Sequence, residues 1–321
     1  MAISSPIRSA LMLVLAASVV FSGCSEDSTE EREGTSTDLS VMFSSDLLGK
    51  IRSCGCTVED SGGLGRRATY TKRMEGGGRD LVVLDCGDLF GMDMAFSVKE
   101  AEVAIQALDI IGVDVFTPGE TDLIFGLPFL LNAAGNASFE TILANMVDPG
   151  TGRPVFGAAW TVIELDTGLR LGVTGVLDDK ILFPQYVDRS GFEVRPAAET
   201  LRRILPEMRE RADFLVLMSH MGIERTRELL EGLQGFDLAV VGHGKPLTKK
   251  EERVGETLLV ATGGLGQYLG RLDLTLSSAG EMEYARLKLV PLPEDIAIDP
   301  EIRELFESYE LPLTDREAGR H

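Results

Sequence analysis

Basic side chains are scarce in this chain of 321 residues, where 31 lysines and arginines stand against 51 aspartates and glutamates. The formal net charge is −20, which argues against a nucleic-acid polymer as partner, because phosphate backbones need lysine- and arginine-rich surfaces. A small anionic substrate is not excluded, since a metal ion and a few local cations can outweigh the global field. The sequence also has no internal repeat and no coiled-coil heptads.

Long apolar runs are equally scarce, and the one candidate lies at the N-terminus. Residues 10–21 are apolar, follow Arg8, and lead into a Ser-Gly-Cys string that ends at Cys24. The run is too short for a mature membrane-spanning helix, and the pattern is typical of a signal peptide over 1–23. The V-F-S-G-C ending resembles the lipobox of bacterial lipoproteins, which implies lipidation of Cys24 and a membrane anchor in the bacterial cell envelope, on its periplasmic or extracellular face. The acidic, polar stretch 24–38 predicts a flexible tether.

Histidine is used three times, and two of the three follow apolar runs typical of buried strands. His220 follows F-L-V-L-M-S, and His243 follows L-A-V-V-G. Side chains just past the carboxyl ends of parallel strands lie where α/β folds place their chemistry, and neutral imidazole is a common metal ligand. The matching positions favour a functional site over two structural histidines.

Carboxylates occupy equivalent strand ends. Asp46 follows V-M-F-S-S, Asp88 follows V-V-L-D-C-G, and Glu120 follows V-F-T-P-G. Carboxylates and imidazoles at one sheet edge suit Mn, Fe or Zn better than Mg or Ca. For Asp122, two residues further on, a helix cap or turn role is favoured. The sequence therefore predicts a divalent metal site at this edge.

In order, these strings resemble the metallophosphoesterase (calcineurin-like) domain of the bacterial 5′-nucleotidase family. The matching strings are S-S-D-L-L-G at 44–49, G-G-L-G-R-R at 62–67, G-D at 87–88, G-E-T-D at 119–122, A-N-M at 144–146, S-H-M-G at 219–222, G-H-G-K at 242–245 and G-Q-Y-L-G-R-L-D-L at 266–274. Each string alone is weak, but the ordered set is specific. The resemblance implies an α/β fold, a four-layer α/β/β/α metallophosphoesterase sandwich, and hydrolysis of phosphate esters. The chain would be a divergent lipoprotein member without the C-terminal nucleotide-binding domain, so a specific nucleotidase is not supported.

The resemblance also implies two metal ions bridged by the aspartate of G-D, and one of the two positions keeps a full set of ligands. Its asparagine is replaced by a glutamate. The implied ligands of this position are Asp88, Glu120, His220 and His243.

The second implied position is partly degenerate. It keeps Asp46, but its two histidines are Leu48 and Lys245, and the family's catalytic histidine is Thr121. Lys245 is expected either to act as an internal counter-ion for the site carboxylates or to cap a loop and point into water. If the chain is active, the candidate catalytic residues are Asp46, Lys245 and Arg66, with Arg66 or Lys245 steadying the phosphate. One divalent ion, Mn, Fe or Zn, is expected.

Three further cysteines, Cys54, Cys56 and Cys86, leave alternatives open. In an oxidising compartment an odd number allows at most one disulfide and one free thiol. A bond between Cys54 and Cys56 would be a strained ring, which favours a disulfide between Cys86 and one of them. Thiolate ligation of the metal is the alternative, although Cys86 alone is typical of a small apolar residue in a buried strand.

Periodicity predicts layered α/β packing in one domain over 39–290, followed by a tail over 291–321 with a short amphipathic helix near 299–309. Strand-like runs at 39–45, 80–86, 113–117, 141–145, 213–219 and 237–242 alternate with helical patterns at 64–75, 98–111, 126–134, 196–211 and 223–233. Later runs at 159–165, 169–176, 257–261, 268–276 and 282–290 suit hairpins of a second sheet.

Two functional hypotheses remain from the sequence. The first is a membrane-tethered, metal-dependent phosphoesterase that acts on a small phosphate-containing molecule. The second is a non-catalytic metal- or ligand-binding protein that keeps the fold, with Leu48, Thr121 and Lys245 as marks of lost chemistry. Neither hypothesis names the substrate or the oligomeric state.

Overall fold

The computed structural model describes residues 36–53, 61–93 and 95–314. The predicted signal peptide, the lipidation site Cys24 and the pair Cys54 and Cys56 lie outside these ranges. The first strand begins at Thr37, so the last two positions of the predicted tether belong to the folded domain. Within the described ranges, no helix combines the length and the apolar character needed to cross a membrane.

The first sheet has six strands in the order β14-β13-β1-β2-β3-β4. Its strands are β1 Thr37–Ser44, β2 Asp80–Asp85, β3 Val115–Phe116, β4 Glu140–Thr141, β13 Tyr268–Leu276 and β14 Met282–Pro291. Strands β1 to β4 are parallel, and β13 pairs antiparallel with β1. The prediction that the β13–β14 hairpin belongs to the second sheet is therefore wrong. Strand β13 pairs with β1 so that Leu272 lies opposite Val41, and the two strands share one apolar face. Periodicity alone does not predict this pairing.

The second sheet also has six strands, in the order β11-β12-β10-β9-β7-β6. Its strands are β6 Trp160–Glu164, β7 Arg170–Leu177, β9 Phe214–His220, β10 Leu238–Gly242, β11 Glu252–Val254 and β12 Thr257–Val260. The predicted β6–β7 hairpin is confirmed, and β7, β9, β10 and β12 run parallel. A small third sheet pairs β5 Met146–Val147 with β8 Glu193–Val194, and most of the run 141–145 that was predicted as a strand is loop.

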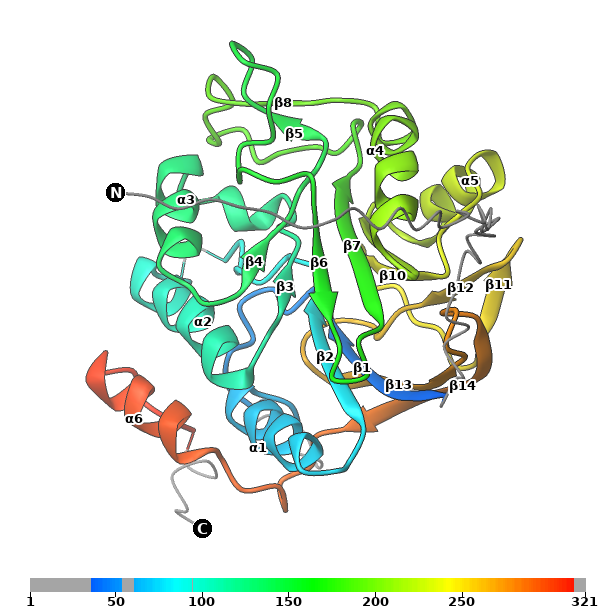
Figure 1. The fold of residues 1–321 in the computed structure, drawn as a ribbon. Helices are drawn as coiled ribbons and strands as arrows, with labels where there is room; N and C mark the ends of the chain where they lie inside the picture. The colour runs from blue at the N-terminus through cyan, green and yellow to red at the C-terminus, as the bar shows by residue number, and fades with distance from the viewer. Residues whose placement is uncertain (1–35, 54–60, 94, 315–321) are drawn as a thin grey trace, which may run out of the picture. The chain divides into compact units, whose positions relative to one another are not determined.

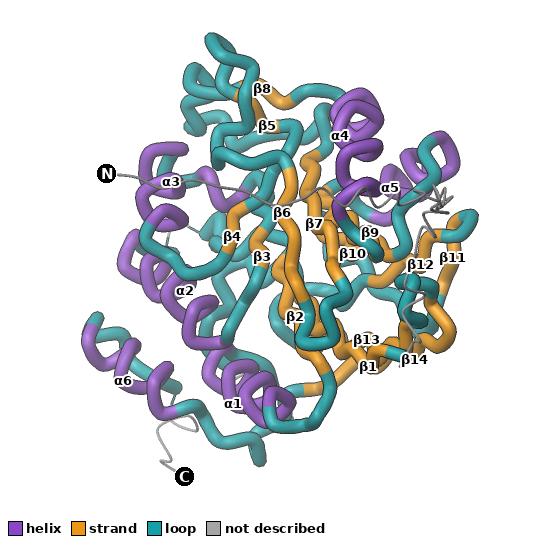
Figure 2. The backbone as a smooth tube through the Cα atoms, in the orientation of Figure 1, coloured by secondary structure: helices purple, strands orange, loops and turns teal. Residues whose placement is uncertain are grey.

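Three apolar clusters define four layers (Figures 1 and 2). One cluster joins the outer face of the first sheet to its helices, a second lies between the two sheets, and a third joins the second sheet to its helices. The helices of the first sheet are α1 Leu64–Glu75, α2 Val98–Ile111 and α3 Leu127–Gly135, and those of the second are α4 Ala197–Arg211 and α5 Ile223–Gly232. The predicted four-layer α/β/β/α sandwich is confirmed.

Local signals explain the helix ends. A capping box begins α2, because Ser97 Oγ accepts the N–H of Glu100 and the Glu100 carboxylate accepts the N–H of Ser97. Gly112 ends the helix in the left-handed region, with φ of 79°. The bounds of α1 and α2 match the predicted ranges 64–75 and 98–111.

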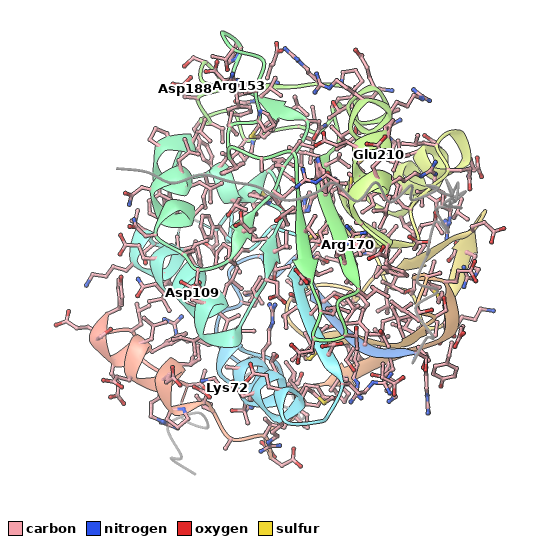
Figure 3. The ribbon with its side chains drawn as sticks, viewed as in Figure 1. Lys72, Asp109, Arg153, Arg170, Asp188 and Glu210 are labelled. Atoms are coloured by element: carbon pink, nitrogen blue, oxygen red, sulfur yellow. The ribbon has the colours of Figure 1, made fainter. Side chains whose placement is uncertain are left out.

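The C-terminal helix α6, Pro300–Ser308, packs on the first-sheet helices. Its apolar side chains Ile302, Leu305 and Phe306 belong to the same cluster as α1 and α2. Lys72 of α1, labelled in Figure 3, lies 3.0 Å from a carboxylate oxygen of Asp299, the residue that caps α6. The tail predicted as a separate segment thus adds to the core of the domain.

Candidate metal centre

Four predicted ligands come together at the carboxyl ends of the parallel strands. Each offers one ligand atom, and these atoms all lie within 4.8 Å of one another. The carboxylates of Asp88 and Glu120 follow β2 and β3 of the first sheet, whereas the imidazoles of His220 and His243 end β9 and follow β10 of the second. The cluster therefore draws two ligands from each sheet.

His220 is fully buried, and a hydrogen bond from its Nδ1 fixes the orientation of its ring. Its Nδ1–H donates to the main-chain carbonyl of Cys86 at 2.6 Å, because a carbonyl can only accept. The other nitrogen, Nε2, lies 3.1 Å from Glu120 Oε2 and 3.4 Å from Asp88 Oδ1. In the neutral imidazole this arrangement leaves the Nε2 lone pair for a metal ion.

His243 completes the cluster from the second sheet. Its Nδ1 lies 3.2 Å from Glu120 Oε1, yet this buried nitrogen has no hydrogen-bond partner of suitable geometry among the described residues. An orphaned imidazole nitrogen beside two carboxylates and a second imidazole is the donor set of a divalent transition metal. The residues present thus fit the metal ion that the sequence predicts.

The charges of the cluster are coupled. Burial alone lowers the pKa of His220, but the charge of Asp88 and hydrogen bonds to Asp88, Cys86 and Glu120 raise it well above its ordinary value. The nearby Glu120 carboxylate raises the pKa of His243, and burial opposes that rise. Burial raises the pKa of Glu120, but the two neighbouring imidazoles outweigh burial and lower it. Without metal, the imidazoles therefore hold protons that a metal ion must displace.

Asp122 holds the ligand loops in place, a role that sequence reasoning missed. Its buried carboxylate accepts four main-chain N–H groups, from Asp88 at 2.9 Å, Gly119 at 2.8 Å, Leu89 at 2.8 Å and Phe90 at 3.2 Å. Burial and then the charge of Asp88 raise the pKa of Asp122 to about 8, and the N–H groups oppose that rise. The bond to Gly119 is the predicted turn contact, but the other three join the β2 and β3 loops. The G-E-T-D string carried the only sequence signal for this role.

Asn145, from the A-N-M string, closes the base of a loop beside the site. Its amide nitrogen donates to the carbonyls of Leu177 at 2.7 Å and Arg195 at 2.8 Å, and its side-chain oxygen accepts the N–H of Leu177 at 2.9 Å. Leu177 lies opposite His220 in the β7–β9 register. Asn145 thus holds both ends of the segment 178–194 next to the metal ligands.

Asp46 and Lys245 meet through the backbone of one turn, and their predicted metal-binding and catalytic roles stay predictions. The Asp46 carboxylate accepts the N–H groups of His243 and Lys245, and Asp46 is not part of the ligand cluster found among the described residues. The Lys245 side chain is exposed and forms no ion pair with any residue that the structure describes. The backbone N–H of Lys245 and not its ammonium meets Asp46, which agrees with the alternative in which the side chain points into water.

Thr121, which the resemblance places at the family's catalytic histidine, lies in a short 3-10 helix, Thr121–Leu123. Its N–H donates to Asp88 Oδ1 at 3.1 Å, and its buried hydroxyl has no hydrogen-bond partner within the described ranges. A threonine at this position cannot supply the titratable group of an imidazole.

Arg66 and its neighbour Arg67 are buried in α1. Arg66 is 2% exposed and donates from Nη1 to the carbonyl of Gly62 at 3.2 Å. The predicted role of Arg66 in steadying a substrate phosphate stays a prediction. Arg67 forms a buried ion pair with Asp85 at 2.8 Å.

Cys86 contributes its carbonyl and not its thiol. Within the described part of the chain it is a free, buried cysteine whose Sγ lies 3.6 Å from the carbonyl oxygen of Val240. Burial raises the pKa of the Cys86 thiol, which keeps it protonated. Neither the disulfide nor the thiolate-ligand alternative holds for Cys86, and the apolar interpretation of this residue is the one that fits.

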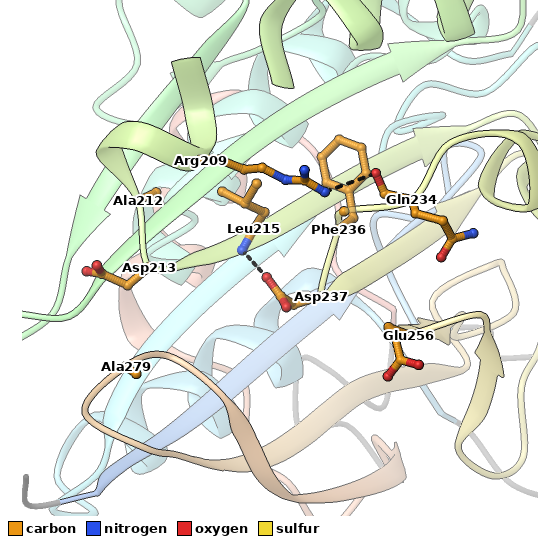
Figure 4. Close-up of a pocket in the computed structure, with 10 residues that line it drawn as sticks. Arg209, Ala212, Asp213, Leu215, Gln234, Phe236, Asp237, Glu256 and Ala279 are labelled. Carbon is orange, nitrogen blue, oxygen red and sulfur yellow. Dashed lines mark hydrogen bonds between the residues drawn. The ribbon is translucent and has the colours of Figure 1, made fainter. Parts of the chain in front are cut away.

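A cavity of about 570 Å³ lies at the opposite edge of the second sheet (Figure 4). Its wall includes Arg209, which donates to the carbonyl of Gln234 at 3.2 Å, and Asp237, which accepts the N–H of Leu215 at 2.7 Å. The cavity residues Leu215 and Asp237 lie where β9 and β10 begin, whereas His220 ends β9 and His243 follows β10. The cavity contains no member of the ligand cluster.

Comparison with known proteins agrees with this fold and site. No family model matches the chain. The chain is 27% identical to the uncharacterized metallophosphoesterase YunD of Bacillus subtilis, over 64% of this chain and 45% of that protein. It is 28% identical to a 2′,3′-cyclic-nucleotide 2′-phosphodiesterase/3′-nucleotidase of Salmonella typhimurium, over 80% of this chain and 46% of that protein. The chain thus spans about half the length of these curated relatives.

A solved structure, the 5′-nucleotidase precursor of Thermus thermophilus, superposes with a TM-score of 0.74 at 19% identity, over 85% of this chain and 58% of that chain. The four-layer sandwich with its metal-ligand cluster is the fold of a calcineurin-like metallophosphoesterase. The homologues and structural neighbours of the chain are metallophosphoesterases of the 5′-nucleotidase family, which confirms the predicted resemblance.

Proposed function

We propose that the protein is a metal-dependent phosphoesterase that uses one divalent ion to hydrolyse a small phosphate ester. The observation that carries this proposal is the convergence of two carboxylates and two imidazoles within 4.8 Å at the carboxyl ends of the strands. A divalent ion, Mn, Fe or Zn, supplies Lewis-acid chemistry to phosphoryl transfer when bound. The residues that would hold it are Asp88, Glu120, His220 and His243.

The second metal position of the family is lost in this proposal. Leu48 offers no donor atom, and Asp46 already accepts two main-chain N–H groups. Lys245 is exposed two residues after His243, where its ammonium can steady the phosphate of a substrate. One ion and a lysine stabilise the attacking and leaving oxygens less well than two ions, which predicts a slow or narrow activity.

The proposal includes a tether to the bacterial cell envelope through lipidated Cys24. The lipobox-like string V-F-S-G-C and the acidic stretch that follows support it. Labelling of cells with a palmitate analogue tests it. Incorporation into the wild type but not into Cys24→Ala, with release of the variant from the membrane fraction, is the expected result.

A non-catalytic metal- or ligand-binding function is the second candidate, and Thr121 favours it. The hydroxyl of Thr121 cannot protonate a leaving group near neutral pH as an imidazole does. In this alternative the cluster binds metal but no turnover follows.

Phosphate release separates the two candidates. We expect the Mn²⁺-loaded protein to hydrolyse p-nitrophenyl phosphate or its bis ester, and His220→Ala and Asp88→Asn to abolish that activity. Asp237→Asn, in the remote cavity, is the matched control and retains it. Joint restoration of histidine at positions 48, 121 and 245 should raise the rate. Metal-loaded wild type no faster than His220→Ala would support the non-catalytic function.

A further inference from the structure

Asp46 is buried, with 1% of its surface exposed, and both carboxylate oxygens bind the backbone of one turn. Oδ2 accepts the N–H of His243 at 3.1 Å, and Oδ1 accepts the N–H of Lys245 at 3.0 Å. The turn that carries a candidate metal ligand thus donates two N–H groups to this one side chain.

The turn has a backbone that needs such an acceptor. His243, Gly244 and Lys245 have φ values of +72°, +81° and +57°, all in the left-handed region. This region costs a residue other than glycine about 1–2 kcal/mol. Successive N–H groups in a turn of this kind form a concavity that binds an anion. The Asp46 carboxylate occupies this concavity and offsets the backbone cost.

Asp46 is itself fixed to the loops of the first sheet. Its N–H donates to the carbonyl of Gly87 at 2.8 Å, one residue before Asp88, and its carbonyl accepts the N–H of Leu265 at 2.8 Å. The residue therefore connects the loop of a first-sheet ligand, Asp88, to the turn of a second-sheet ligand, His243. The distance between these two ligands depends on a connection of this kind.

We propose, on the basis of the metal site proposed above, that Asp46 is a positioning residue. It holds the imidazole of His243 against Asp88 and Glu120 and does not bind a second ion. The surroundings agree, because Leu48 has no donor atom and the side chain of Lys245 is exposed. The protein accordingly binds one ion per chain.

Titration of the purified full-length chain with Mn²⁺ tests this role, with native mass spectrometry to count the ions. We expect one ion in the wild type, and one ion bound about 10–100-fold more weakly in Asp46→Asn, the range for residues that orient metal ligands. Asp114→Asn is the matched control, since Asp114 also accepts a main-chain N–H but lies at the start of β3. Two ions in the wild type and one in Asp46→Asn would overturn the proposal.

Hydrogen exchange of the metal-free protein separates this role from the metal site itself. The amides of His243 and Lys245 should exchange at least about tenfold faster in Asp46→Asn, while the buried amides of β9 stay unchanged. Asp46→Ser, whose hydroxyl accepts one N–H, is the second variant if Asp46→Asn does not fold. A protein that binds no Mn²⁺ yet shows this exchange pattern keeps the positioning role and refutes the metal-dependent function. Equal exchange rates at His243 and Lys245 in wild type and variant would overturn the positioning role.

Discussion

His220 donates its Nδ1–H to the main-chain carbonyl of Cys86 across 2.6 Å, and this bond aims the opposite ring nitrogen at the two cluster carboxylates. The bond needs the backbone of Cys86 and not its sulfur. Metal binding should therefore not depend on which side chain occupies position 86.

Replacement of Cys86 by alanine should leave metal affinity within about twofold of the wild type. The buried sulfur contacts the apolar cluster between the sheets, so the variant should lose about 1 kcal/mol of unfolding free energy. Isothermal titration and urea unfolding measure the two quantities. A loss of affinity comparable to that of His220→Ala would show that the thiol is a ligand after all.

Asp122→Ala should be among the most destabilising single changes near the site. It removes the acceptor of four buried main-chain N–H groups, for an expected loss of about 3 kcal/mol or more of unfolding free energy. Metal affinity should fall as well, because the β2 and β3 loops carry Asp88 and Glu120. Asp122→Asn keeps one acceptor oxygen, so its unfolding free energy should lie between those of the wild type and Asp122→Ala. Wild-type stability in Asp122→Ala would contradict the assigned role.

The metal-free protein should lose stability as the pH rises. The pKa values of His220 and His243 are raised in the folded state, so their contribution is complete below the unfolded value of about 6.5 and is lost as the pH climbs through the folded values. Metal affinity should change in the opposite direction, because each bound ion displaces protons. Urea unfolding at several pH values, and titration calorimetry in buffers of different ionisation enthalpy, check both trends. Metal binding without proton release would contradict this account.

Asp114→Asn should remove a second pH dependence that is independent of the metal. Burial raises the pKa of Asp114 to about 6, although its carboxylate accepts the N–H of Val83 at 2.7 Å. The folded protein therefore binds a proton more tightly than the unfolded chain, and stability falls as the pH rises from about 4 to 6. The asparagine side chain keeps an acceptor for the N–H of Val83. The free energy of unfolding of Asp114→Asn at pH 7 should therefore exceed that of the wild type by roughly 1–3 kcal/mol. An identical pH profile for the two proteins would exclude Asp114 as the source.

The ligand set could be predicted from the sequence because each ligand ends an apolar run, and parallel strands bring their ends to one edge. Helices α1 and α2 were equally predictable, since a capping box and glycines mark α2 and apolar spacing marks both. The sheet to which β13 belongs could not be predicted. Alternation of apolar and polar residues indicates a strand but does not indicate which strand pairs with it.

The residues that position the ligands were harder to predict. Asp122 acts on backbone groups more than 30 residues away, and no local pattern records such a contact. Lys245 and Arg66 were placed at the site by the family resemblance, whereas the direction of their side chains depends on a left-handed turn and on burial in a helix.

The bonds of Asn145 have a consequence for how the site can diversify. One amide joins the two ends of the segment 178–194 and so ties β7 to the residues that precede α4. The segment begins one residue beyond the partner of His220 and exposes Leu182 and Tyr186, at 90% and 65%. Doubling its length would cost only about 0.6 kcal/mol of closure entropy. Length changes confined to the exposed part of this segment, near Leu182 and Tyr186, should therefore be tolerated while the candidate metal ligands keep their positions.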